Sequence, residues 1–231
     1  MERAVFGKGQ LEVALNPSAK DKAVTPGLHS LLLDKTRDAL VYVPPSYTPD
    51  QPAPLAVMLH GAGGDAKHGM SLLQPVADAA GMILLAPFSR RGTWDIIAEE
   101  RFGPDVLFIN QALEQVVQRY HINLGKLALG GFSDGASYAL SLGLINGDLF
   151  THILAFSPGF YYAPQPSGRP KVYISHGVHD HILPIEPCSR RLVPKLKKGG
   201  YEVLYHEFNG EHVLPDFVQR EATDWFLKRA W

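Results

Sequence analysis

The chain has 231 residues, of which 45% are hydrophobic and 19% are charged, the proportions of an ordinary globular protein. This length is enough for one large domain with a substantial core, and we expect residues 1–231 to form a single domain. The 22 basic and 23 acidic side chains leave a formal net charge of −1, which gives no electrostatic case for binding nucleic acid or an anionic membrane.

The start of the chain and its single cysteine predict a cytoplasmic protein. Residues 1–8 lack the apolar core of a signal peptide, and no apolar run is long enough to span a bilayer, so membrane insertion is not expected. The lone Cys188 excludes an internal disulfide and suits a reducing compartment. The sequence carries no signal for an oligomeric state.

Short apolar runs alternate with longer amphipathic segments along most of the chain. Two leading strands are expected, and a proline-rich surface crossover follows them at 44–54. The strands are expected at 28–33, 39–43, 55–59, 82–86, 126–130, 153–156, 172–175 and 201–205. Helices are expected at 69–80, 104–120, 135–145, 186–198 and 214–229. The alternation predicts an α/β fold with a mostly parallel central sheet flanked by helices.

The most informative motif is Gly131-Phe132-Ser133-Asp134-Gly135, which has the form G-x-S-x-G. It follows the predicted strand at 126–130 and precedes the predicted helix at 135–145. In that context the motif is typical of a nucleophile elbow, a sharp turn that exposes the serine hydroxyl. A side chain two residues before or after the serine would collide with neighbouring backbone, which is the reason for a glycine at both places.

A glycine-rich turn, His60-Gly61-Ala62-Gly63-Gly64-Asp65, follows the predicted strand at 55–59. Such a turn points backbone N–H groups at an external anion, which in acyl transfer is the tetrahedral oxyanion. We assign the oxyanion donors to the backbone amides of Ala62 and Asp134, with Gly61 or Gly63 as alternatives to Ala62. The spacing matches neither G-x-G-x-x-G nor a P-loop, so nucleotide binding fits poorly.

The segment His176-Gly177-Val178-His179-Asp180-His181 follows the predicted strand at 172–175. Asp180 would lie at the carboxyl end of that strand, where it can orient a catalytic histidine and stabilise its imidazolium form. An alternative is a metal site, with the ligands His176, His179, Asp180 and His181. An exposed polar turn is a third possibility, because Asp and His are common in loops.

The histidine of the predicted site is His212, on the loop after the last predicted strand. His206 is less suitable because it lies inside the strand pattern. Glu207 and Glu211 are possible acids of the triad, but they lie close to the base in sequence, and Asp180 fits better. The order Ser133, Asp180, His212 places each residue directly after a predicted strand. This order differs from those of chymotrypsin and subtilisin and matches that of α/β-hydrolases.

These motifs resemble the phospholipase/carboxylesterase type of α/β-hydrolase, the group that includes acyl-protein thioesterases. The similarity runs from about Ala39 to the carboxyl terminus and rests on residues 44–47, 60–65, 94–95, 131–135, 176–180 and 210–212. It implies an α/β-hydrolase fold, a Ser133/Asp180/His212 triad, an oxyanion hole at Ala62 and Asp134, and no cofactor or metal. Thioesterases of the group usually carry Gln-Gly-Gly after the serine. This chain has Asp-Gly-Ala, which favours a general esterase.

The gap between the predicted strand at 153–156 and the next strand near Lys171 is too short for the helical lid of many α/β-hydrolases. We therefore expect no lid domain and an open site that suits small or medium acyl esters. The candidates for an apolar acyl pocket are Trp94, Phe160, Tyr161, Ile182 and Leu183. Core or rim packing is an equal alternative for each of them.

The sequence thus predicts a serine carboxylesterase that hydrolyses a small-molecule ester through an acyl-enzyme. A thioesterase or amidase would use the same residues. A metal-dependent hydrolase centred on the His176–His181 segment is a less favoured alternative. So is a non-catalytic ligand-binding protein, which would more commonly have lost one member of the triad.

Overall fold

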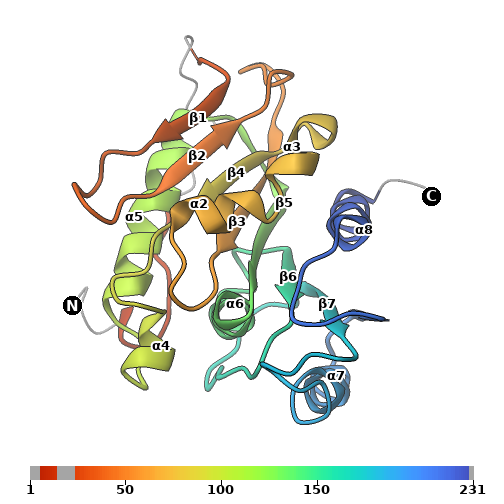
Figure 1. The fold of residues 1–231 in the computed structure, drawn as a ribbon. Coiled ribbons are helices and arrows are strands. Elements are labelled where there is room, and N and C mark those ends of the chain that lie inside the picture. Colours follow the sequence, from red (N-terminus) through yellow and green to blue (C-terminus); the bar gives the residue numbers. More distant parts are fainter. Residues whose placement is uncertain (1–5, 15–23, 229–231) are drawn as a thin grey trace.

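The near-continuous apolar runs become the central strands of one eight-stranded sheet (Figure 1). The computed structural model describes residues 6–14 and 24–228. Its strands are β1 (Gly27–Ser30), β2 (Leu40–Val43), β3 (Ala53–Leu59), β4 (Ile83–Ala86), β5 (Ile122–Phe132), β6 (His152–Phe156), β7 (Lys171–Gly177) and β8 (Val203–Phe208). The sheet order is β1-β2-β4-β3-β5-β6-β7-β8, and only the pairs β1–β2 and β2–β4 are antiparallel. The predicted single-domain, mostly parallel α/β fold is confirmed.

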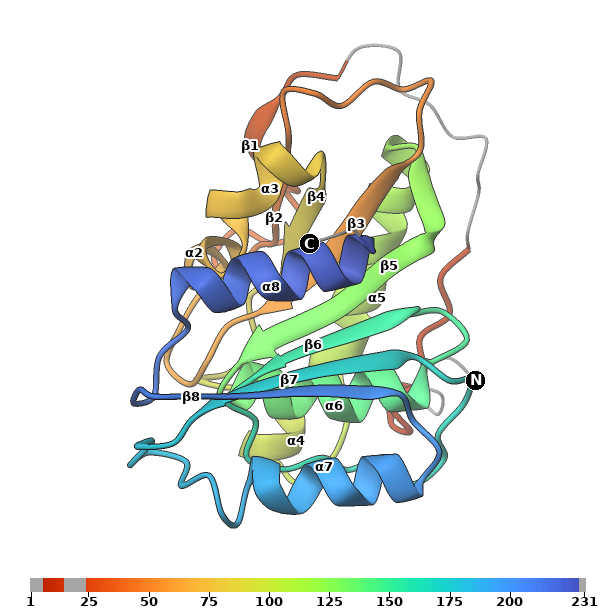
Figure 2. The ribbon, with the colours of Figure 1, turned by 90° about the vertical axis from the view of Figure 1, so that its right-hand side faces the viewer.

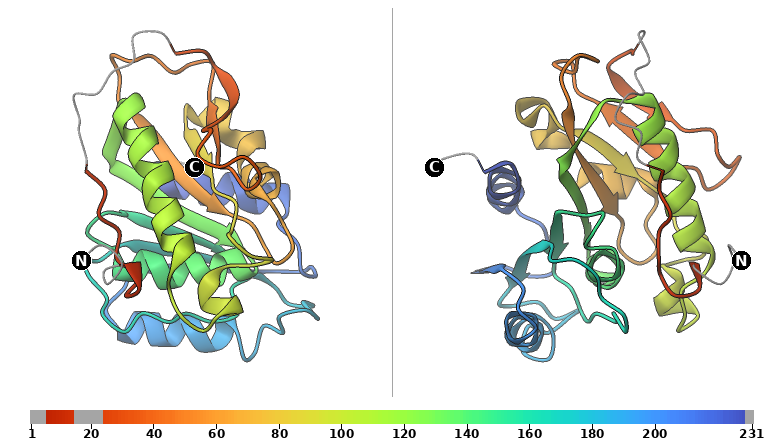
Figure 3. Two further views of the ribbon diagram at one scale, coloured as in Figure 1. Left: turned by 90° about the vertical axis from the view of Figure 1, so that its left-hand side faces the viewer. Right: turned by 180° about the vertical axis from the view of Figure 1, so that it is seen from behind.

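Helices cover both faces of the sheet, as Figure 3 shows for α5 and α8 on opposite sides. One face carries α2 (Ala66–Ser71), α3 (Gln74–Ala80) and α8 (Asp216–Leu227). The other carries α4 (Asp95–Ala98), α5 (Pro104–Arg119), α6 (Asp134–Ile145) and α7 (Ser189–Lys198). The sheet has a hydrophobic core on each face, and successive β3 side chains pack into the two cores alternately because they point to opposite faces. Val57 packs with the α5 side and Met58 with the α2 side.

The structure divides the helix predicted at 69–80 into α2 and α3. Pro75 lies in the first turn of α3, where its missing N–H costs nothing. In one continuous helix its ring would clash with the carbonyl of Ser71, so α2 ends at that residue. The last strand begins at Val203, two residues later than predicted. The final helix was predicted to end at residue 229, which lies outside the described residues.

The parallel strands bring their carboxyl ends to one edge of the sheet. Strands β5 to β8 run side by side in Figure 2, and β3 pairs with β5 in the same direction. The segments that follow β3, β5, β7 and β8 therefore meet at this edge, where open α/β sheets place their ligands. None of the helices in the described residues combines the length and hydrophobicity that a membrane span needs.

Candidate active site

Ser133 occupies the turn between β5 and α6 in a strained conformation, with φ 58° and ψ −121°. Few residues other than glycine adopt a positive φ, and those that do are concentrated at functional sites. Close packing requires the flanking glycines: a Cβ on Gly131 would lie 2.5 Å from the Gly135 carbonyl oxygen, and one on Gly135 would lie 2.2 Å from the Leu59 oxygen. The predicted strand–elbow–helix context is therefore present.

Asp180 and His212 meet at the end of β7 and β8. His212 donates from Nδ1 to Asp180 Oδ2 over 2.6 Å, which leaves Nε2 as the imidazole nitrogen available for a proton transfer. The His212 ring lies beside the elbow, because its centroid is 4.6 Å from that of Phe132, the residue before Ser133. The structure thus gathers the three predicted residues at one edge of the sheet.

Buried hydrogen bonds fix the Asp180 carboxylate. Its Oδ1 accepts from the backbone amides of Ile182 and Leu183, at 2.9 and 2.8 Å. Burial raises the pKa of Asp180, but the bonds from His212 and Leu183 outweigh burial and hold that pKa below its ordinary value. The carboxylate is therefore ionised at neutral pH and bonded at both oxygens, which is what orienting an imidazole requires.

The loops that carry Asp180 and His212 are tied directly to each other. The amide of Val178 donates to the Phe208 carbonyl and the amide of His179 to the Gly210 carbonyl, both over 2.9 Å. Gly177 lets the loops approach, since a Cβ there would lie 2.3 Å from the Glu211 oxygen. The hydrogen bonds between the two loops therefore fix the position of the acid relative to the base.

The glycine-rich turn after β3 lies against the elbow: a Cβ on Gly61 would be 3.4 Å from the Ser133 Cβ. The amides of Gly63 and Gly64 are used within the protein, by the carbonyls of Gly92 and Gly61 respectively. Among the described residues, no acceptor binds the amide of Ala62. Gly63 is thereby a poorer candidate than Ala62 for the oxyanion donor.

His60 holds this turn in place. The Ser89 amide donates to Nε2 over 3.1 Å, so Nδ1 carries the proton and donates to the Gly61 carbonyl over 2.7 Å. Burial lowers the pKa of His60, which favours this neutral form. The Gly61 oxygen and the Ala62 N–H belong to one planar peptide unit and point in opposite directions. His60 therefore sets the direction of the Ala62 amide.

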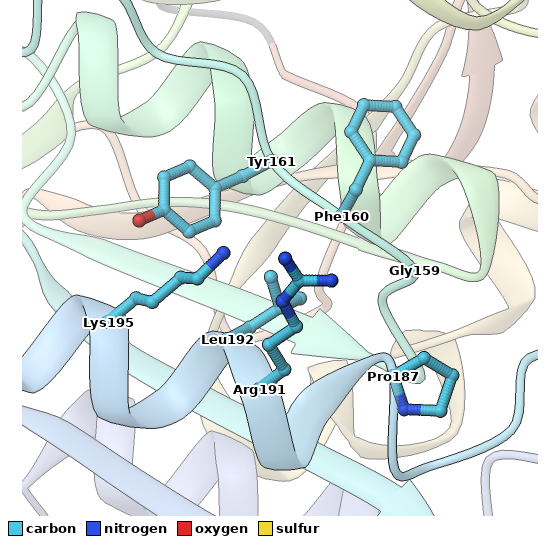
Figure 4. A pocket seen from close by; sticks show the side chains of 7 residues that line it. All are labelled: Gly159, Phe160, Tyr161, Pro187, Arg191, Leu192 and Lys195. Atoms are coloured by element: carbon cyan, nitrogen blue, oxygen red, sulfur yellow. The ribbon is translucent and has the colours of Figure 1, made fainter.

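The predicted pocket residues have different environments. Trp94 is fully buried and stacks on Tyr138. It donates from Nε1 to the His60 carbonyl over 2.8 Å, so it packs under the glycine-rich turn and does not line a pocket. Ile182 is 69% exposed. Leu183 is half-buried, with its side chain beside Gly159. Phe160 and Tyr161 line a cavity of about 410 Å³ between the loop after β6 and helix α7 (Figure 4).

A second cavity, of about 300 Å³, lies beside the elbow at the glycine-rich turn. It is bounded by the glycine-rich turn at 61–64, by His68, Ser71 and Leu72 of the following segment, and by Phe132. Because Phe132 also contacts the His212 ring, this cavity lies on the histidine side of Ser133.

His176 and His179 of the segment 176–181 have different environments. His176 is buried and donates from Nε2 to the Leu183 carbonyl over 2.8 Å, while Nδ1 accepts from the Ser189 hydroxyl. Its Nε2 also lies 3.2 Å from Asp180 Oδ2, the carboxylate oxygen that accepts from His212. His179 bonds to Asn209 at the surface. Within the described part of the chain, no group of three or more His, Cys, Asp or Glu side chains is arranged to hold a metal ion.

Sequence comparison finds esterases. The chain is 26% identical over 152 residues to a bifunctional acetylxylan esterase/xylanase from Neocallimastix patriciarum, which covers 64% of this chain and 22% of that protein. It is 26% identical over 175 residues to feruloyl esterase C of Emericella nidulans, and the aligned region covers 72% of this chain and 62% of that protein. The chain thus spans less than two thirds of either relative, and no family model matches it.

Solved esterases have the same fold. Esterase PE8 matches with a TM-score of 0.63 and 23% identity over 78% of this chain and 97% of that one. A phospholipase/carboxylesterase from Dyadobacter fermentans matches with a TM-score of 0.63 and 20% identity over 83% and 97%. The chain has the α/β-hydrolase fold. A ferulic acid esterase from Anaeromyces mucronatus, solved with ferulic acid, is a further match to this chain, with a TM-score of 0.61 and 20% identity over 96% and 98% of the two chains.

The resemblance to α/β-hydrolase esterases predicted from the motifs is therefore confirmed, and the predicted enzyme class agrees with the named activities of the relatives. Sequence reasoning did not identify the residues that support the candidate site. His60, Thr93 and Ser137 bond to the glycine-rich turn, to Asp134 and to the loop after β6 respectively. Only His60 had a sequence signal, its place directly after a buried strand.

Proposed function

We propose that the protein is a serine carboxylesterase in which Ser133 is the nucleophile, His212 the general base and Asp180 the residue that orients it. The observation that carries the proposal is the 2.6 Å bond from His212 to Asp180 beside a serine at φ 58°. A strained serine, an imidazole with one nitrogen bonded to a carboxylate, and the amide of Ala62, which no acceptor in the described part of the chain binds, together supply what acyl transfer needs.

In the proposed mechanism His212 Nε2 takes the proton of the Ser133 hydroxyl while Oγ attacks the ester carbonyl. The amides of Ala62 and Asp134 donate to the oxyanion of the tetrahedral intermediate. His212 then protonates the leaving alcohol, and water hydrolyses the acyl-enzyme by the same route. Asp180 remains ionised and stabilises the imidazolium.

The leaving alcohol has a natural place in the 300 Å³ cavity beside Phe132. His212 protonates the leaving oxygen, so the alcohol lies on the histidine side of the serine. The name of one sequence relative, a bifunctional acetylxylan esterase/xylanase, favours an alcohol that belongs to a carbohydrate, and the name of the other, a feruloyl esterase, favours an aromatic acyl group. Because an esterase and a thioesterase would use the same catalytic residues, only a substrate panel can distinguish them. Methyl ferulate, acetylated xylan and an acyl thioester release methanol, a carbohydrate and a thiol respectively, and their relative kcat/KM values show which leaving group the enzyme prefers.

The direct test is hydrolysis of p-nitrophenyl butyrate by the wild type and by Ser133→Ala, with EDTA present in both assays. We expect wild-type turnover that falls at least about a thousandfold in the variant. Activity that survives the substitution, or that EDTA alone abolishes, would contradict the proposal and would direct attention to the His176–His181 segment.

A further inference from the structure

The cavity between the loop after β6 and helix α7 combines apolar walls with two cationic side chains. Gly159, Phe160, Tyr161, Pro187, Arg191, Leu192 and Lys195 line it. Arg191 and Lys195 are four residues apart, so they lie on the same face of α7. Figure 4 shows their charged ends directed from α7 toward the loop, and Tyr161 of that loop lines the same cavity.

The positive charge of this cavity is not neutralised locally. Within the described residues, no acidic side chain pairs with Arg191 or Lys195, whereas the neighbouring Arg190 pairs with Glu186 and Glu207. Helix α7 carries five basic and no acidic residues, and the facing segment 157–170 has no acidic residue either. In a chain with a net charge of −1, this concentration of unpaired cations favours an anionic ligand.

Hydrogen bonds connect the cavity to the candidate nucleophile. The Ser137 hydroxyl accepts from the Gly159 amide at 2.9 Å and donates to the Ser133 carbonyl at 3.3 Å. Ser137 is four residues after Ser133 on α6, which corresponds to about 6 Å along the helix. The rim of the cavity therefore lies a short acyl chain away from the serine.

We propose that this cavity binds a carboxylate at the far end of the substrate's acyl chain. The proposal rests on the esterase function above, and it gives the two cavities different roles. The cavity beside Phe132 lies on the histidine side and takes the alcohol, which leaves the α7 cavity for the acyl group. Leu192 and Pro187 contact the methylene groups of that chain, and Arg191 and Lys195 donate to its carboxylate.

The test compares mono-4-nitrophenyl esters of glutaric, adipic, pimelic and suberic acids with the same esters capped as neutral methyl esters. At the best chain length and low salt, we expect the acid to have a kcat/KM about tenfold above its neutral partner. The double variant R191Q/K195Q should lose this preference and should keep its activity on the neutral ester. The matched control Lys198→Gln removes a charge from the same helix outside the cavity, and it should keep the preference.

Binding separates this proposal from the esterase proposal. Monomethyl adipate should bind to the Ser133→Ala variant in calorimetry, and the same variant with R191Q/K195Q should bind it about tenfold more weakly. A protein that binds the monoester in this way but hydrolyses no ester would keep the anionic site and contradict the esterase. Equal rates for acid and neutral esters at every length, or a preference and an affinity that the double variant retains, would overturn the anionic site.

Discussion

Thr93 donates its hydroxyl proton to the carboxylate of Asp134, over 2.6 Å between Oγ1 and Oδ2. Asp134 directly follows the candidate nucleophile, and its backbone amide is the second proposed oxyanion donor. A free carboxylate here would oppose the negative charge that develops on the oxyanion. The bond to Thr93 instead holds the carboxylate against the segment that precedes α4. The backbone amide of Asp134 thus serves the proposed oxyanion hole, while its side chain connects α6 to that segment.

The Asp134→Ala variant should therefore keep most of its activity. The backbone amide remains, so we expect kcat/KM for p-nitrophenyl butyrate to stay within about tenfold of the wild type. The lost hydrogen bond and the lost negative charge in the first turn of α6 should lower the free energy of unfolding by about 1 kcal/mol. Urea unfolding and steady-state kinetics measure the two effects. A thousandfold loss of activity in a folded variant would show that the carboxylate itself is catalytic.

The Asp180→Asn variant should lose about 10⁴-fold in kcat, because an amide cannot hold the His212 tautomer as the carboxylate does. The matched control is His179→Asn, in the same loop, whose exposed side chain bonds to Asn209 at the surface. That variant should retain full activity. An Asp180→Asn enzyme that turns over at the wild-type rate would remove Asp180 from the mechanism.

The elbow should not accept a side chain at Gly135. A Cβ there would lie 2.2 Å from the Leu59 oxygen and 2.5 Å from the His60 oxygen, so the strand or the turn must shift. We expect Gly135→Ala to destabilise the fold by more than about 3 kcal/mol or to prevent soluble expression. Gly92→Ala is the control, because a Cβ at Gly92 meets nothing within 4 Å. Similar melting temperatures for the two variants would contradict the packing described at the elbow.

A pair of buried carboxylates beneath the site should make stability depend on pH. The amide of Asp95 donates to Asp105 Oδ2 at 2.7 Å, and the amide of Asp105 donates to Asp95 Oδ2 at 3.0 Å. Burial, together with the charge of Asp95, raises the pKa of Asp105 from 3.8 to about 7. Between these values the folded chain holds a proton that the unfolded chain has released. The contribution of Asp105 to stability therefore falls as pH rises from about 4 to 7.

That fall should amount to roughly 2 to 4 kcal/mol in the free energy of unfolding. Asp105→Asn cannot ionise, so its unfolding free energy should vary less with pH over this window. Urea unfolding at pH 4.5, 6 and 7.5 measures the difference, with the exposed Asp148→Asn as the control. Parallel pH profiles for wild type and Asp105→Asn would show that Asp105 is ionised in the folded protein.

Local sequence patterns predicted the features of the site that depend on local geometry. The elbow depends on glycines two residues either side of Ser133, and Asp180 and His212 each follow a strand, so motif and spacing were sufficient. The break between α2 and α3 was also encoded locally, by Pro75, but the amphipathic pattern across 69–80 concealed it.

Features that depend on distant pairs could not be predicted in this way. Trp94 is a residue type that often lines pockets. Its place in the core depends on two distant partners, since its ring stacks on Tyr138 and its Nε1 donates to the His60 carbonyl. The position of Arg191 and Lys195 across a cavity from the loop after β6 depends likewise on how α7 packs against the sheet, which no local pattern specifies.

The most direct test of the central claim is to label the nucleophile covalently and locate the label. The protein is treated with an aryl fluorophosphonate until esterase activity is lost, digested with trypsin, and the peptide that follows Lys126 is sequenced by tandem mass spectrometry. We expect one adduct per chain, on Ser133, and none in Ser133→Ala. An adduct on Ser137, Ser141 or another residue, or full loss of activity without a modified Ser133, would contradict the claim that Ser133 is the nucleophile.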